Sequence, residues 1–389
     1  MTPKLLRITT VPISLHKLLQ GQANFMQKNG FEVLLASAKG KEIEQIEKET
    51  GLNVKTLSFT RKISPFTDLS ALWQTYRFIK KEKPTIVHTH TPKAGIVGML
   101  AAKLAGVPIR LHTVAGMPLM EAKGIKRKIL NFVEKLTYKA ATKVYPNSYG
   151  LQEIIIQNHL AKPEKLKVIA NGSSNGIDTQ YFSTSYFTEA DRNELKAQLN
   201  ISPDDFVFIF VGRLVGDKGI NELVEAFKSL PKDYSDSKLL LVGNEEPELD
   251  PLKKETQKEI RQNPNIITTG WVEDVRPYFA IADALVFPSY REGFPNVVLQ
   301  AGAMELPSVV TDINGCNEII TNEHNGLIIP PKNTIELQKA MEKILTDKGL
   351  YIQMKKNARP IIVDKYRQEV VWEALLEEYR RLLEESGLN

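Results

Sequence analysis

Short apolar runs alternate with amphipathic segments along most of this chain, and this alternation limits the fold more than any other feature. In the first half, strands are expected at residues 5–10, 31–37, 54–59, 86–90, 109–114, 143–146 and 166–170. Segments with helical periodicity lie between them, for instance 69–81 and 125–141. Apolar runs that do not alternate strictly with polar residues, and that are separated by helices, are typical of a parallel sheet covered on both faces.

The alternation stops where the sequence turns polar, at about residues 181–202, and then begins again. Strands are expected at 206–211, 238–242, 266–269, 284–287 and 308–311. Helices are expected at 220–230, 251–262, 275–282, 296–304 and 334–346. The second series therefore predicts another doubly wound α/β unit. An amphipathic helix at 368–385, with no strand after it, ends the pattern.

We therefore expect an α/β protein with two Rossmann-like domains that face a central cleft. The N-terminal domain is placed at 1–183, a linker at 184–202 and the C-terminal domain at 203–365. Residues 366–389 are expected to form a helix that braces both domains. Ligands of open α/β sheets bind at the carboxyl ends of the strands, so functional side chains should follow strands directly.

Composition narrows the class of protein. A chain of 389 residues is too long for a single core, and its one cysteine, Cys316, cannot form an intramolecular disulfide. No signal-peptide pattern is expected, because residues 1–7 lead directly into an apolar strand. The longest apolar stretch, 94–109, is interrupted by Lys103 and Pro108 and is too short to span a bilayer. We expect a cytoplasmic protein.

Charge is distributed unevenly along the chain. The net charge is +5, but residues 1–180 carry 27 Lys and Arg against 12 Asp and Glu, a net charge of +15, which leaves −10 for the other 209 residues. Such asymmetry suggests that the first half faces a polyanion, either nucleic acid or an acidic membrane surface. The simpler alternative is that the lysines only solubilise an ordinary surface.

One turn combines glycines with two cations. The stretch "VFIFVGRLVGDKGI" (207–220) is a strand followed by Gly212, Arg213, Gly216, Lys218 and Gly219, before a helix begins. Backbone N–H groups, a helix N-terminus and two cations suit an anion such as a phosphate group. Neither a P-loop nor a G-x-G-x-x-G run occurs, which disfavours ATP hydrolysis and dinucleotide redox chemistry. A solvated turn with a glycine cap is the simpler alternative.

A second loop, in "YREGFPNVVLQAGAMELP" (290–307), places a carboxylate before a helix. Pro295 suits the first helical position, and Glu292 lies in the loop before it. A carboxylate there can accept hydrogen bonds from sugar hydroxyls. Gln300 lies in the second turn, where its amide matches the vicinal hydroxyls of a ribose. For Gln300, the simpler alternative is a half-buried polar residue without a ligand.

These stretches carry a resemblance to a known family. The stretches that carry it in the second half are "VGRLVGDKGI", "LLLVG", "GWVEDVRPYFAIADALVFPSYREGFPNVVLQAGAMELPSVVTDINGCNEII" and "NGLIIPP". Together they cover most of residues 205–345, which resemble the nucleotide-sugar half of retaining glycosyltransferases of family 4. Members of that family have the GT-B fold. The first half is similar to the subgroup that extends lipid-diphosphate-linked glycans in bacterial capsule, O-antigen and glycoprotein pathways, in "IVHTHTPKAGIVGMLAAKLAGV" and "LHTVAGM". "ANGSSNGIDTQYF" resembles the family's Asn-Gly-x-Asp segment.

The resemblance implies roles for particular residues. Arg213 and Lys218 would hold the diphosphate of the sugar nucleotide, and Glu292 matches the first acid of the family's E-x7-E motif, which contacts the donor sugar. These three are the expected catalytic residues. Gly293, Phe294 and Pro295 would lay backbone amides along the sugar and phosphate. The complete expected donor set is Gly212, Arg213, Lys218, Glu292, Gly293, Phe294, Pro295, Asn296 and Gln300.

Three positions depart from the family pattern. Gln300 replaces the second acid of the motif, which binds ribose in relatives, a task that an amide can also perform. Ala115 stands where many relatives have a histidine. The loop at 11–15 lacks the paired glycines of many relatives.

The family also implies a mechanism and a set of substrates. A nucleotide-sugar, with UDP favoured, would donate its sugar with retention of configuration to a lipid-diphosphate-linked glycan. The favoured picture is front-face attack, in which a leaving phosphate oxygen takes the acceptor proton and no protein nucleophile is needed. Neither a cofactor nor a metal is expected, and the sequence has no Asp-x-Asp run and no Cys/His ligand cluster.

Candidate acceptor residues cluster after one strand of the first half. His88, His90, Thr91 and Lys93 are expected to follow that strand, open a helix and face the cleft, where they would meet the acceptor's diphosphate or hydroxyl. His112, on the next strand, joins this set. The simpler alternative is that the histidines are satisfied core residues.

A basic amphipathic stretch is a candidate membrane contact. It combines the basic residues Lys123, Lys126, Arg127 and Lys128 with the apolar residues Ile125, Ile129, Leu130 and Phe132. Each basic residue near an anionic bilayer contributes about 1 kcal/mol. The stretch therefore predicts peripheral attachment to the inner face of the cell membrane, with a plain solvated helix face as the alternative.

Other functions fit parts of the same pattern. A UDP-hexosamine epimerase of similar two-domain build would bind the same donor without an acceptor. A nucleic-acid-binding protein could use the basic half, although the basic residues are scattered and lack interleaved aromatic platforms, so no nucleic acid is expected. A non-catalytic sugar-binding module would fit the departures at Ala115 and Gln300.

Overall fold

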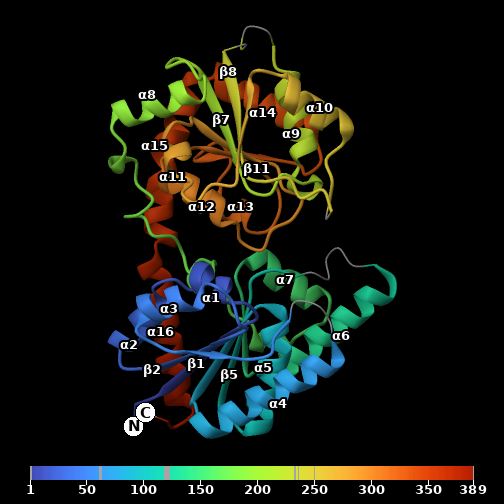
Figure 1. Ribbon diagram of the computed structural model, residues 1–389, viewed down its shortest axis with the longest axis vertical. Helices are drawn as coiled ribbons and strands as arrows, with labels where there is room; N and C mark the ends of the chain where they lie inside the picture. Colours follow the sequence, from blue (N-terminus) through green and yellow to red (C-terminus); the bar gives the residue numbers. More distant parts are fainter. Residues whose placement is uncertain are drawn as a thin grey trace. The chain divides into compact units, whose positions relative to one another are not determined.

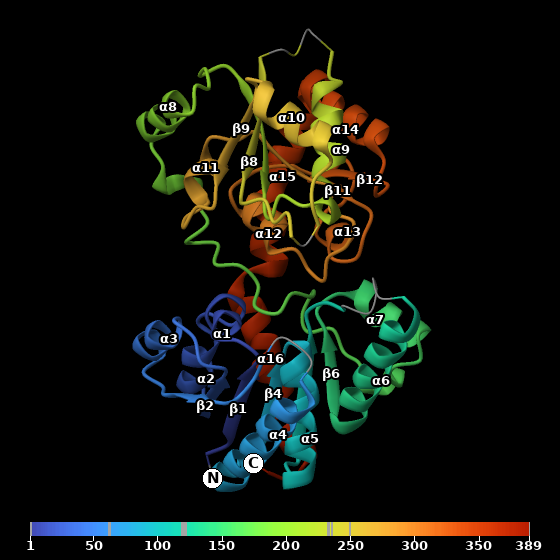
Figure 2. The same cartoon turned by 45° about the vertical axis from the view of Figure 1, so that its right-hand side comes forward.

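The protein forms two compact α/β units in a computed structural model (Figures 1 and 2). The structure describes residues 2–60, 64–117, 123–231, 234, 236–248 and 250–388. The first unit comprises Met1–Gly176 together with Gln368–Asn389, and the second comprises Ile177–Arg367.

Six parallel strands form the sheet of the first unit, in the order β3-β2-β1-β4-β5-β6. They are β1 (Lys4–Thr9), β2 (Glu32–Ser37), β3 (Val54–Thr56), β4 (Ile86–His90), β5 (Ile109–Val114) and β6 (Lys143–Pro146). The helices are α1 (Pro12–Leu18), α2 (Gln22–Lys28), α3 (Ile43–Thr50), α4 (Pro65–Glu82), α5 (Pro92–Ala105), α6 (Gly124–Ala140), α7 (Tyr149–Gln157) and α16 (Gln368–Glu385).

Both faces of this sheet are buried, as the continuous apolar strands predict. Along β1, Leu6 and Ile8 join a core with α4, α5 and α6, while Leu5 joins a second core with α1, α2 and α16. Adjacent residues of a strand point to opposite faces, so a strand covered on both sides must be apolar at nearly every position.

The second unit repeats this topology with the order β12-β11-β10-β7-β8-β9, again all parallel. Its strands are β7 (Phe206–Val211), β8 (Ser237–Val242), β9 (Ile266–Gly270), β10 (Ala284–Phe287), β11 (Ser308–Thr311) and β12 (Gly326–Ile329). Its helices are α8 (Glu189–Gln198), α9 (Ile220–Lys228), α10 (Lys254–Gln262), α11 (Arg276–Ala280), α12 (Asn296–Ala303), α13 (Cys316–Ile319), α14 (Thr334–Thr346) and α15 (Lys348–Tyr366).

Each sheet has one point at which the strand order reverses. In the first unit it lies between β1 and β4, and in the second between β7 and β10. The loops that leave two such neighbouring strands diverge to opposite faces of the sheet, and ligands of doubly wound folds bind in the crevice between them. The two reversal points therefore indicate where to look for a site in each unit.

The structure corrects several sequence-based expectations. The stretch 166–170 is not a strand: only Leu166 bridges Val144, and Ala170 has a φ of 49°. The expected strand at 54–59 ends at Thr56. The four-residue strand β12 and the polar, proline-containing helix α15 were not predicted, because neither has a strong apolar period.

The chain between and after the two sheets also differs from expectation. The stretch 184–202, predicted as a linker, contains α8, which begins with a complete capping box and lies in the second unit. Helix α16 lies in the first unit, where Leu375, Tyr379 and Leu382 enter one of its cores. Among the described residues, no helix is both long and apolar enough to cross a membrane.

Candidate donor site

The turn after β7 lies against the end of β10 because of one glycine. Gly219 has a φ of 72°, and a Cβ atom there would overlap the carbonyl oxygen of Pro288. Only glycine fits such a close approach in the left-handed region. The short 3-10 helix Gly216–Lys218 is thereby held beside the loop that follows β10.

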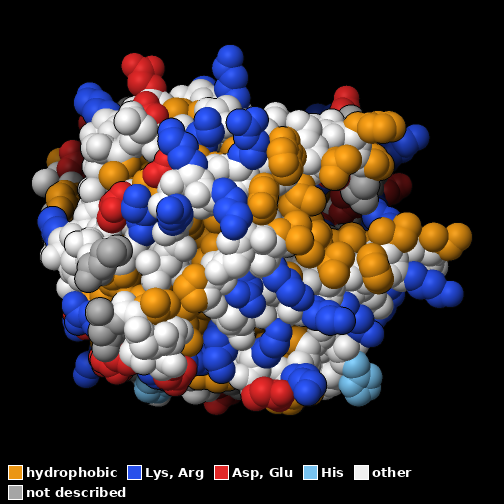
Figure 3. Space-filling view, turned by 90° about the horizontal axis from the view of Figure 1, so that it is seen from below, with side chains coloured by type: hydrophobic (Ala, Val, Ile, Leu, Met, Phe, Trp, Pro, Cys, Tyr) orange, Lys and Arg blue, Asp and Glu red, His pale blue; other side chains and the backbone are white. Residues whose placement is uncertain are grey.

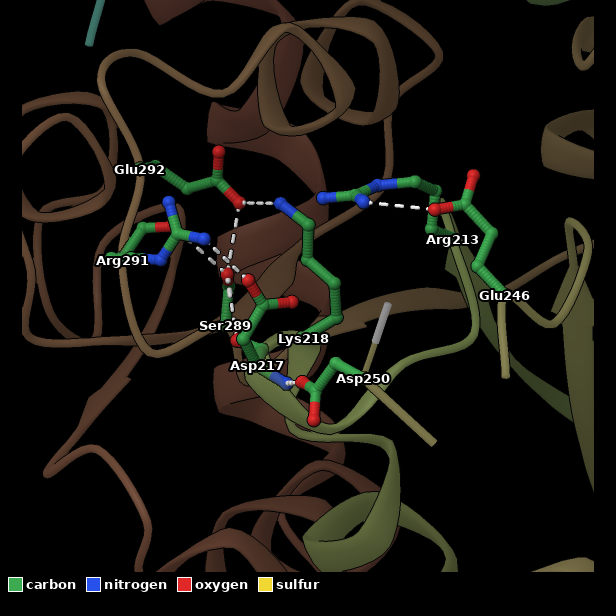
Figure 4. A network of polar contacts seen from close by, with 8 residues as sticks. All are labelled: Arg213, Asp217, Lys218, Glu246, Asp250, Ser289, Arg291 and Glu292. Atoms are coloured by element: carbon green, nitrogen blue, oxygen red, sulfur yellow. Dashed lines mark hydrogen bonds and ion pairs between the residues drawn. The ribbon is translucent and has the colours of Figure 1, made fainter. Parts of the chain in front are cut away.

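Lys218 and Glu292 meet across these two loops. The Nζ atom of Lys218 pairs with Oε1 of Glu292, to which the Ser289 hydroxyl also donates at 2.9 Å (Figure 4). Each of the two charged side chains is 17% exposed, so the pair is mostly buried but still reaches solvent. The sequence predicted that both residues serve one ligand, and the structure brings them together.

The loop that carries Glu292 is fixed by residues at the end of the neighbouring strand β11 and just after it. The hydroxyl of Thr311 donates to the Ser289 carbonyl, and the side-chain amide of Asn314 donates to the Glu292 carbonyl. Gly315 has a φ of 80°, and a Cβ atom there would lie 2.7 Å from the Gly293 carbonyl oxygen. These contacts hold the carboxylate in place before any ligand binds.

A second ion pair joins the same two loops beneath the first. The Arg291 guanidinium contacts Oδ2 of Asp217 at 2.7 Å, and the Asp217 backbone N–H donates to the Asp250 carboxylate at 2.6 Å (Figure 4). Sequence reasoning assigned no role to Asp217, Asp250 or Ser289. The partners of Asp217 and Asp250 are distant in sequence, so no local motif could have indicated them, whereas Ser289 lies only three residues before its partner Glu292.

Arg213 lies apart from this cluster. Its Nη1 atom contacts the Glu246 carboxylate at 3.0 Å, and its side chain is 46% exposed. The loop position predicted for it is confirmed, but its partner is an acid from the loop after β8. A guanidinium this exposed can exchange a surface carboxylate for a phosphate at little cost.

The N-terminus of α12 offers unused hydrogen-bond donors. Within the described part of the chain, the backbone N–H groups of Gly293, Phe294, Asn296 and Val297 have no acceptor. Pro295 was predicted to contribute a backbone amide, but proline has no N–H. It is also the N-cap rather than the first helical residue. The four remaining donors, at the positive end of the helix, suit an anion.

Gln300 lies one turn further along α12. It is half-buried, and its side chain has no hydrogen bond to any described residue.

The thiol of Cys316 stays protonated and therefore does not act as a base in the site. Burial, with a smaller contribution from the Glu292 charge, raises its pKa well above the ordinary value. The described residues contain no group of three or more His, Cys, Asp or Glu that could hold a metal.

The histidines of the first unit are not where the sequence placed them. His88 and His90 lie within β4 rather than after it, and both are buried. His88 bonds to the Tyr379 hydroxyl at 2.6 Å and to the Thr113 hydroxyl at 2.8 Å. Burial, followed by the charges of neighbouring residues, lowers the pKa values of His88 and His90, so both are neutral at pH 7.

His112 is separated from this pair by the sheet. Its ring bonds to the Thr89 hydroxyl at 2.8 Å and packs under α5, where a Cβ atom on Gly95 would lie 2.5 Å from it. Burial lowers its pKa to about 4. His88 and His90, with ring centroids 4.2 Å apart, lie on the opposite face beneath α16.

Thr91 and Lys93 do lie at the carboxyl end of β4. Thr91 is the N-cap residue of α5, and its hydroxyl bonds to that of Thr10 at 2.7 Å, which ties together the loops after β4 and β1. The Lys93 ammonium pairs with Asp68 at 2.6 Å. These loops start at the reversal point of the first sheet, just as the loops that carry Lys218 and Glu292 start at the reversal point of the second sheet.

Comparison with known proteins places this arrangement in a family. A model of group 1 glycosyl transferases matches residues 191–360, and a model of the glycosyl transferase 4-like domain matches 16–172. The capsular polysaccharide biosynthesis glycosyltransferase CapM of Staphylococcus aureus is 34% identical over 384 residues, with 98% of each chain covered. A UDP-Gal:α-D-GlcNAc-diphosphoundecaprenol α-1,3-galactosyltransferase of Escherichia coli is 33% identical over 310 residues, which covers 79% of this chain and 78% of that protein.

Solved structures agree on the fold. Anabaena Alr3699/HepE, crystallised with UDP, superimposes with a TM-score of 0.80 at 19% identity, over 97% of this chain and 100% of that one. WaaG, a glycosyltransferase involved in lipopolysaccharide biosynthesis, gives a TM-score of 0.73 at 16% identity, over 96% and 98%. The chain therefore belongs to the group 1, glycosyltransferase 4-like family, and it is a glycosyltransferase of the GT-B fold.

Proposed function

We propose that this glycosyltransferase transfers a sugar from a UDP-linked donor, with retention of configuration, to a lipid-diphosphate-linked glycan or a growing polysaccharide during surface glycan synthesis. The observation that carries the proposal is the meeting of Lys218 and Glu292 at the reversal point of the second sheet. One cation and one carboxylate, presented side by side, match the diphosphate and the hydroxyls of a sugar nucleotide.

In this proposal the donor diphosphate replaces Glu292 as the partner of Lys218. The free N–H groups at the start of α12 and the exposed guanidinium of Arg213 complete its surroundings. Positive charge is thereby supplied where the leaving diphosphate gains negative charge, which is the largest single contribution that such a site can make. A departing phosphate oxygen takes the acceptor proton in a front-face displacement, so the proposal needs neither a protein nucleophile nor a metal.

Glu292, released from Lys218, accepts hydrogen bonds from the hydroxyls of the transferred sugar. Its position does not depend on the ion pair, because Ser289 and Asn314 hold its carboxylate and its carbonyl. Gln300 takes the ribose, since its amide has no partner among the residues that the structure describes. The two charged loops and the start of α12 would thus bind the sugar, the diphosphate and the ribose of the donor.

The acceptor is proposed to bind at the reversal point of the first sheet. Thr91 and Lys93 present a hydroxyl and an ammonium at the carboxyl end of β4, where a lipid diphosphate can exchange with Asp68 for the ammonium. His90 lies directly beneath them and His88 beside it. The Escherichia coli relative is named for a diphosphoundecaprenol acceptor, which supports this class of substrate.

Attachment to an anionic membrane is the remaining part of the proposal. At the start of α6, the N-cap residue Lys123 and the helical residues Lys126, Arg127 and Lys128 are exposed, as are Ile125 (77%) and Phe132 (66%). Helix α4 adds Phe66, Leu69 and Trp73, all exposed and on one helical face. The face drawn in Figure 3 shows hydrophobic side chains gathered on one side, with lysine and arginine side chains beside them. Such a surface suits an interfacial contact at the inner face of the cell membrane.

A donor and acceptor screen tests the proposal. The full chain would be incubated with UDP- and GDP-sugars and short lipid-diphosphate sugars, with products identified by mass spectrometry and the new anomeric configuration by NMR. We expect one UDP-sugar to yield an extended lipid with the configuration of the donor. An altered UDP-sugar formed without acceptor would favour an epimerase, and an inverted product would overturn the retaining mechanism.

A further inference from the structure

Asp217, the residue before Lys218, is held at three polar groups. Its backbone N–H donates to Oδ2 of Asp250 at 2.6 Å, and its carbonyl accepts from the backbone N–H of Tyr290 at 2.9 Å. Its carboxylate contacts Nη2 of Arg291 at 2.7 Å (Figure 4). Two of these contacts come from the loop after β10, which also carries Glu292. Asp217 therefore ties the turn after β7 to two neighbouring loops.

A glycine makes room for this arrangement. A Cβ atom on Gly216 would lie 2.9 Å from both carboxylate oxygens of Asp250. The backbone N–H of Gly216 also donates to the Asp250 carbonyl at 3.3 Å. A side chain at this position would push the carboxylate away from the Asp217 N–H. The glycine and the acid thus act together to fix the turn that presents Lys218.

Lys218 itself depends on a contact that the donor would replace. Its ammonium pairs with Glu292 and lies 5.6 Å from the centre of the Phe287 ring. In the function proposed above, on which this inference rests, a diphosphate displaces Glu292 from the ammonium. The ion pair between Asp217 and Arg291 includes neither Lys218 nor Glu292, so it can persist through that exchange.

We propose that Asp217 and Arg291 are positioning residues of the donor site, whose ion pair keeps the Lys218 turn against the Glu292 loop while the donor binds. Neither side chain touches the donor. Arg291 also neutralises the Asp217 carboxylate, which would otherwise repel a diphosphate on the adjacent residue. If Arg291 instead bound the diphosphate directly, Asp217 would be a competitor, and its removal would strengthen binding.

A double variant without a change in net charge tests the positioning role. Asp217→Ala, Arg291→Met removes the ion pair, whose side chains are 23% and 38% exposed. We expect UDP affinity, measured by isothermal titration calorimetry, to fall about 5-fold, the upper range for a partly exposed pair. The unfolding midpoint should stay within about 3 °C of wild type. Asp217→Ala alone should also weaken UDP binding, whereas Arg291→Lys, which keeps the charge, should bind within about 2-fold of wild type.

The matched control is Asp274→Ala, Arg276→Met. Arg276 contacts Asp274 at 2.7 Å in the same unit, but the two residues lie only two positions apart at the start of α11. This variant should bind UDP as tightly as wild type. Tighter UDP binding in Asp217→Ala would overturn the positioning role by making Arg291 a ligand. A midpoint lowered by more than about 3 °C in the Asp217, Arg291 double variant would overturn it by making the pair a part of the fold.

Lys218→Ala, measured in the same series, separates this inference from the proposed function. If Lys218→Ala weakens UDP binding and the Asp217, Arg291 double variant does not, the positioning role is wrong and the donor site stands. If neither variant changes UDP affinity, the donor site is misplaced and the positioning role falls with it. Losses in both variants, together with an unchanged control, support both.

Discussion

Lys218 and Glu292 form an ion pair between loops that are 74 positions apart in the sequence. The pair joins the loop after β7 to the loop after β10, the two neighbouring strands at which the order of the second sheet reverses. Both side chains are mostly buried. The pair therefore places a cation and a carboxylate, shielded from solvent, at the reversal point where doubly wound sheets bind ligands. In the function proposed above, an incoming diphosphate would compete with Glu292 for the ammonium, and the released carboxylate would face the sugar.

Removing either cation should weaken donor binding. For Lys218→Ala and Arg213→Ala we expect a roughly 10–100-fold loss of affinity for UDP, as is typical for hydrogen bonds to charged groups. Isothermal titration calorimetry measures this directly. Lys228→Ala is a matched control, because Lys228 is an exposed lysine of the same unit that pairs with Glu259. Unchanged UDP affinity in the two site variants would place the diphosphate elsewhere.

Glu292→Ala should behave differently from the cation variants. We expect turnover to fall about 100-fold, while UDP binds as tightly as to wild type or more tightly, because Lys218 loses its competing partner. The comparison requires kcat for transfer and, separately, the Kd of UDP. A parallel loss of UDP affinity would show that the carboxylate supports the nucleotide rather than the sugar.

Gln300 should contribute to nucleotide affinity through the ribose alone. Gln300→Ala is expected to weaken UDP binding by about 5–10-fold, the usual effect of losing one neutral hydrogen bond. Gln300→Glu should retain activity, since a carboxylate also accepts from ribose hydroxyls. The effect of Gln300→Ala should vanish for a UDP analogue that lacks both ribose hydroxyls. If the analogue showed the same loss, the amide would contact another part of the donor.

The donor loops could be predicted from sequence because their signals are local. The run at 206–211 ends at a glycine-rich turn, and the run at 284–287 ends before a proline and an acid, so both loops follow strands whose apolar residues are unmistakable. Neighbouring parallel strands then bring the loops together without further information. Lys218 and Glu292 meet for this reason.

The supporting contacts could not be predicted, because they come from distant parts of the chain. Asp250 reaches the Asp217 backbone from a different loop, and Asn314 holds the Glu292 carbonyl from beyond the next strand, β11. The histidines show the same limit. The motif at 86–90 predicts a strand, but only the packing of α16, with Tyr379 on His88, shows that the ring is buried.

Gly219→Ala should damage both the fold and the donor site. The new methyl group would overlap the Pro288 carbonyl in a left-handed backbone conformation, which costs on the order of 2–4 kcal/mol. We expect a lower unfolding midpoint by thermal denaturation and weaker UDP binding, because Lys218 is the adjacent residue. Gly349→Ala is the control: Gly349 lies in a helix and a Cβ atom there has room. Equal midpoints for the two variants would contradict the close approach.

Charge reversal on α6 should release the protein from anionic vesicles. For the double variant Lys126→Glu, Arg127→Glu we expect at least a roughly 30-fold loss of binding to phosphatidylglycerol vesicles, since each basic residue contributes about 1 kcal/mol. Co-sedimentation measures the bound fraction. The matched control is Lys258→Glu, Arg261→Glu on α10, two exposed basic residues of the other unit. Equal losses of vesicle binding in both double variants would indicate a general effect of net charge rather than a membrane-binding surface on α6.

Glu378 should make stability depend on pH in a defined range. Its carboxylate is buried and contacts the Lys167 ammonium at 2.5 Å, the Arg381 guanidinium at 2.8 Å and the Tyr145 hydroxyl at 3.1 Å. Burial alone would raise its pKa, but the hydrogen bonds from Arg381 and Lys167 outweigh burial and lower the pKa to about 2. A folded-state pKa below the ordinary 4.5 means that the stabilisation is complete above pH 4.5 and is lost as the pH falls towards 2.

Urea unfolding of wild type and Glu378→Gln across this range measures the effect. At pH 7 the variant should be less stable by about 1–2 kcal/mol, a moderate loss because both cations are half exposed and the amide can still bond to Tyr145. Between pH 4.5 and pH 2 the difference should close, since the wild-type carboxyl becomes protonated there. Glu377→Gln, a change at the exposed neighbour, should match wild type throughout. A difference that stayed constant down to pH 2 would mean that Glu378 stabilises the fold by shape rather than by charge.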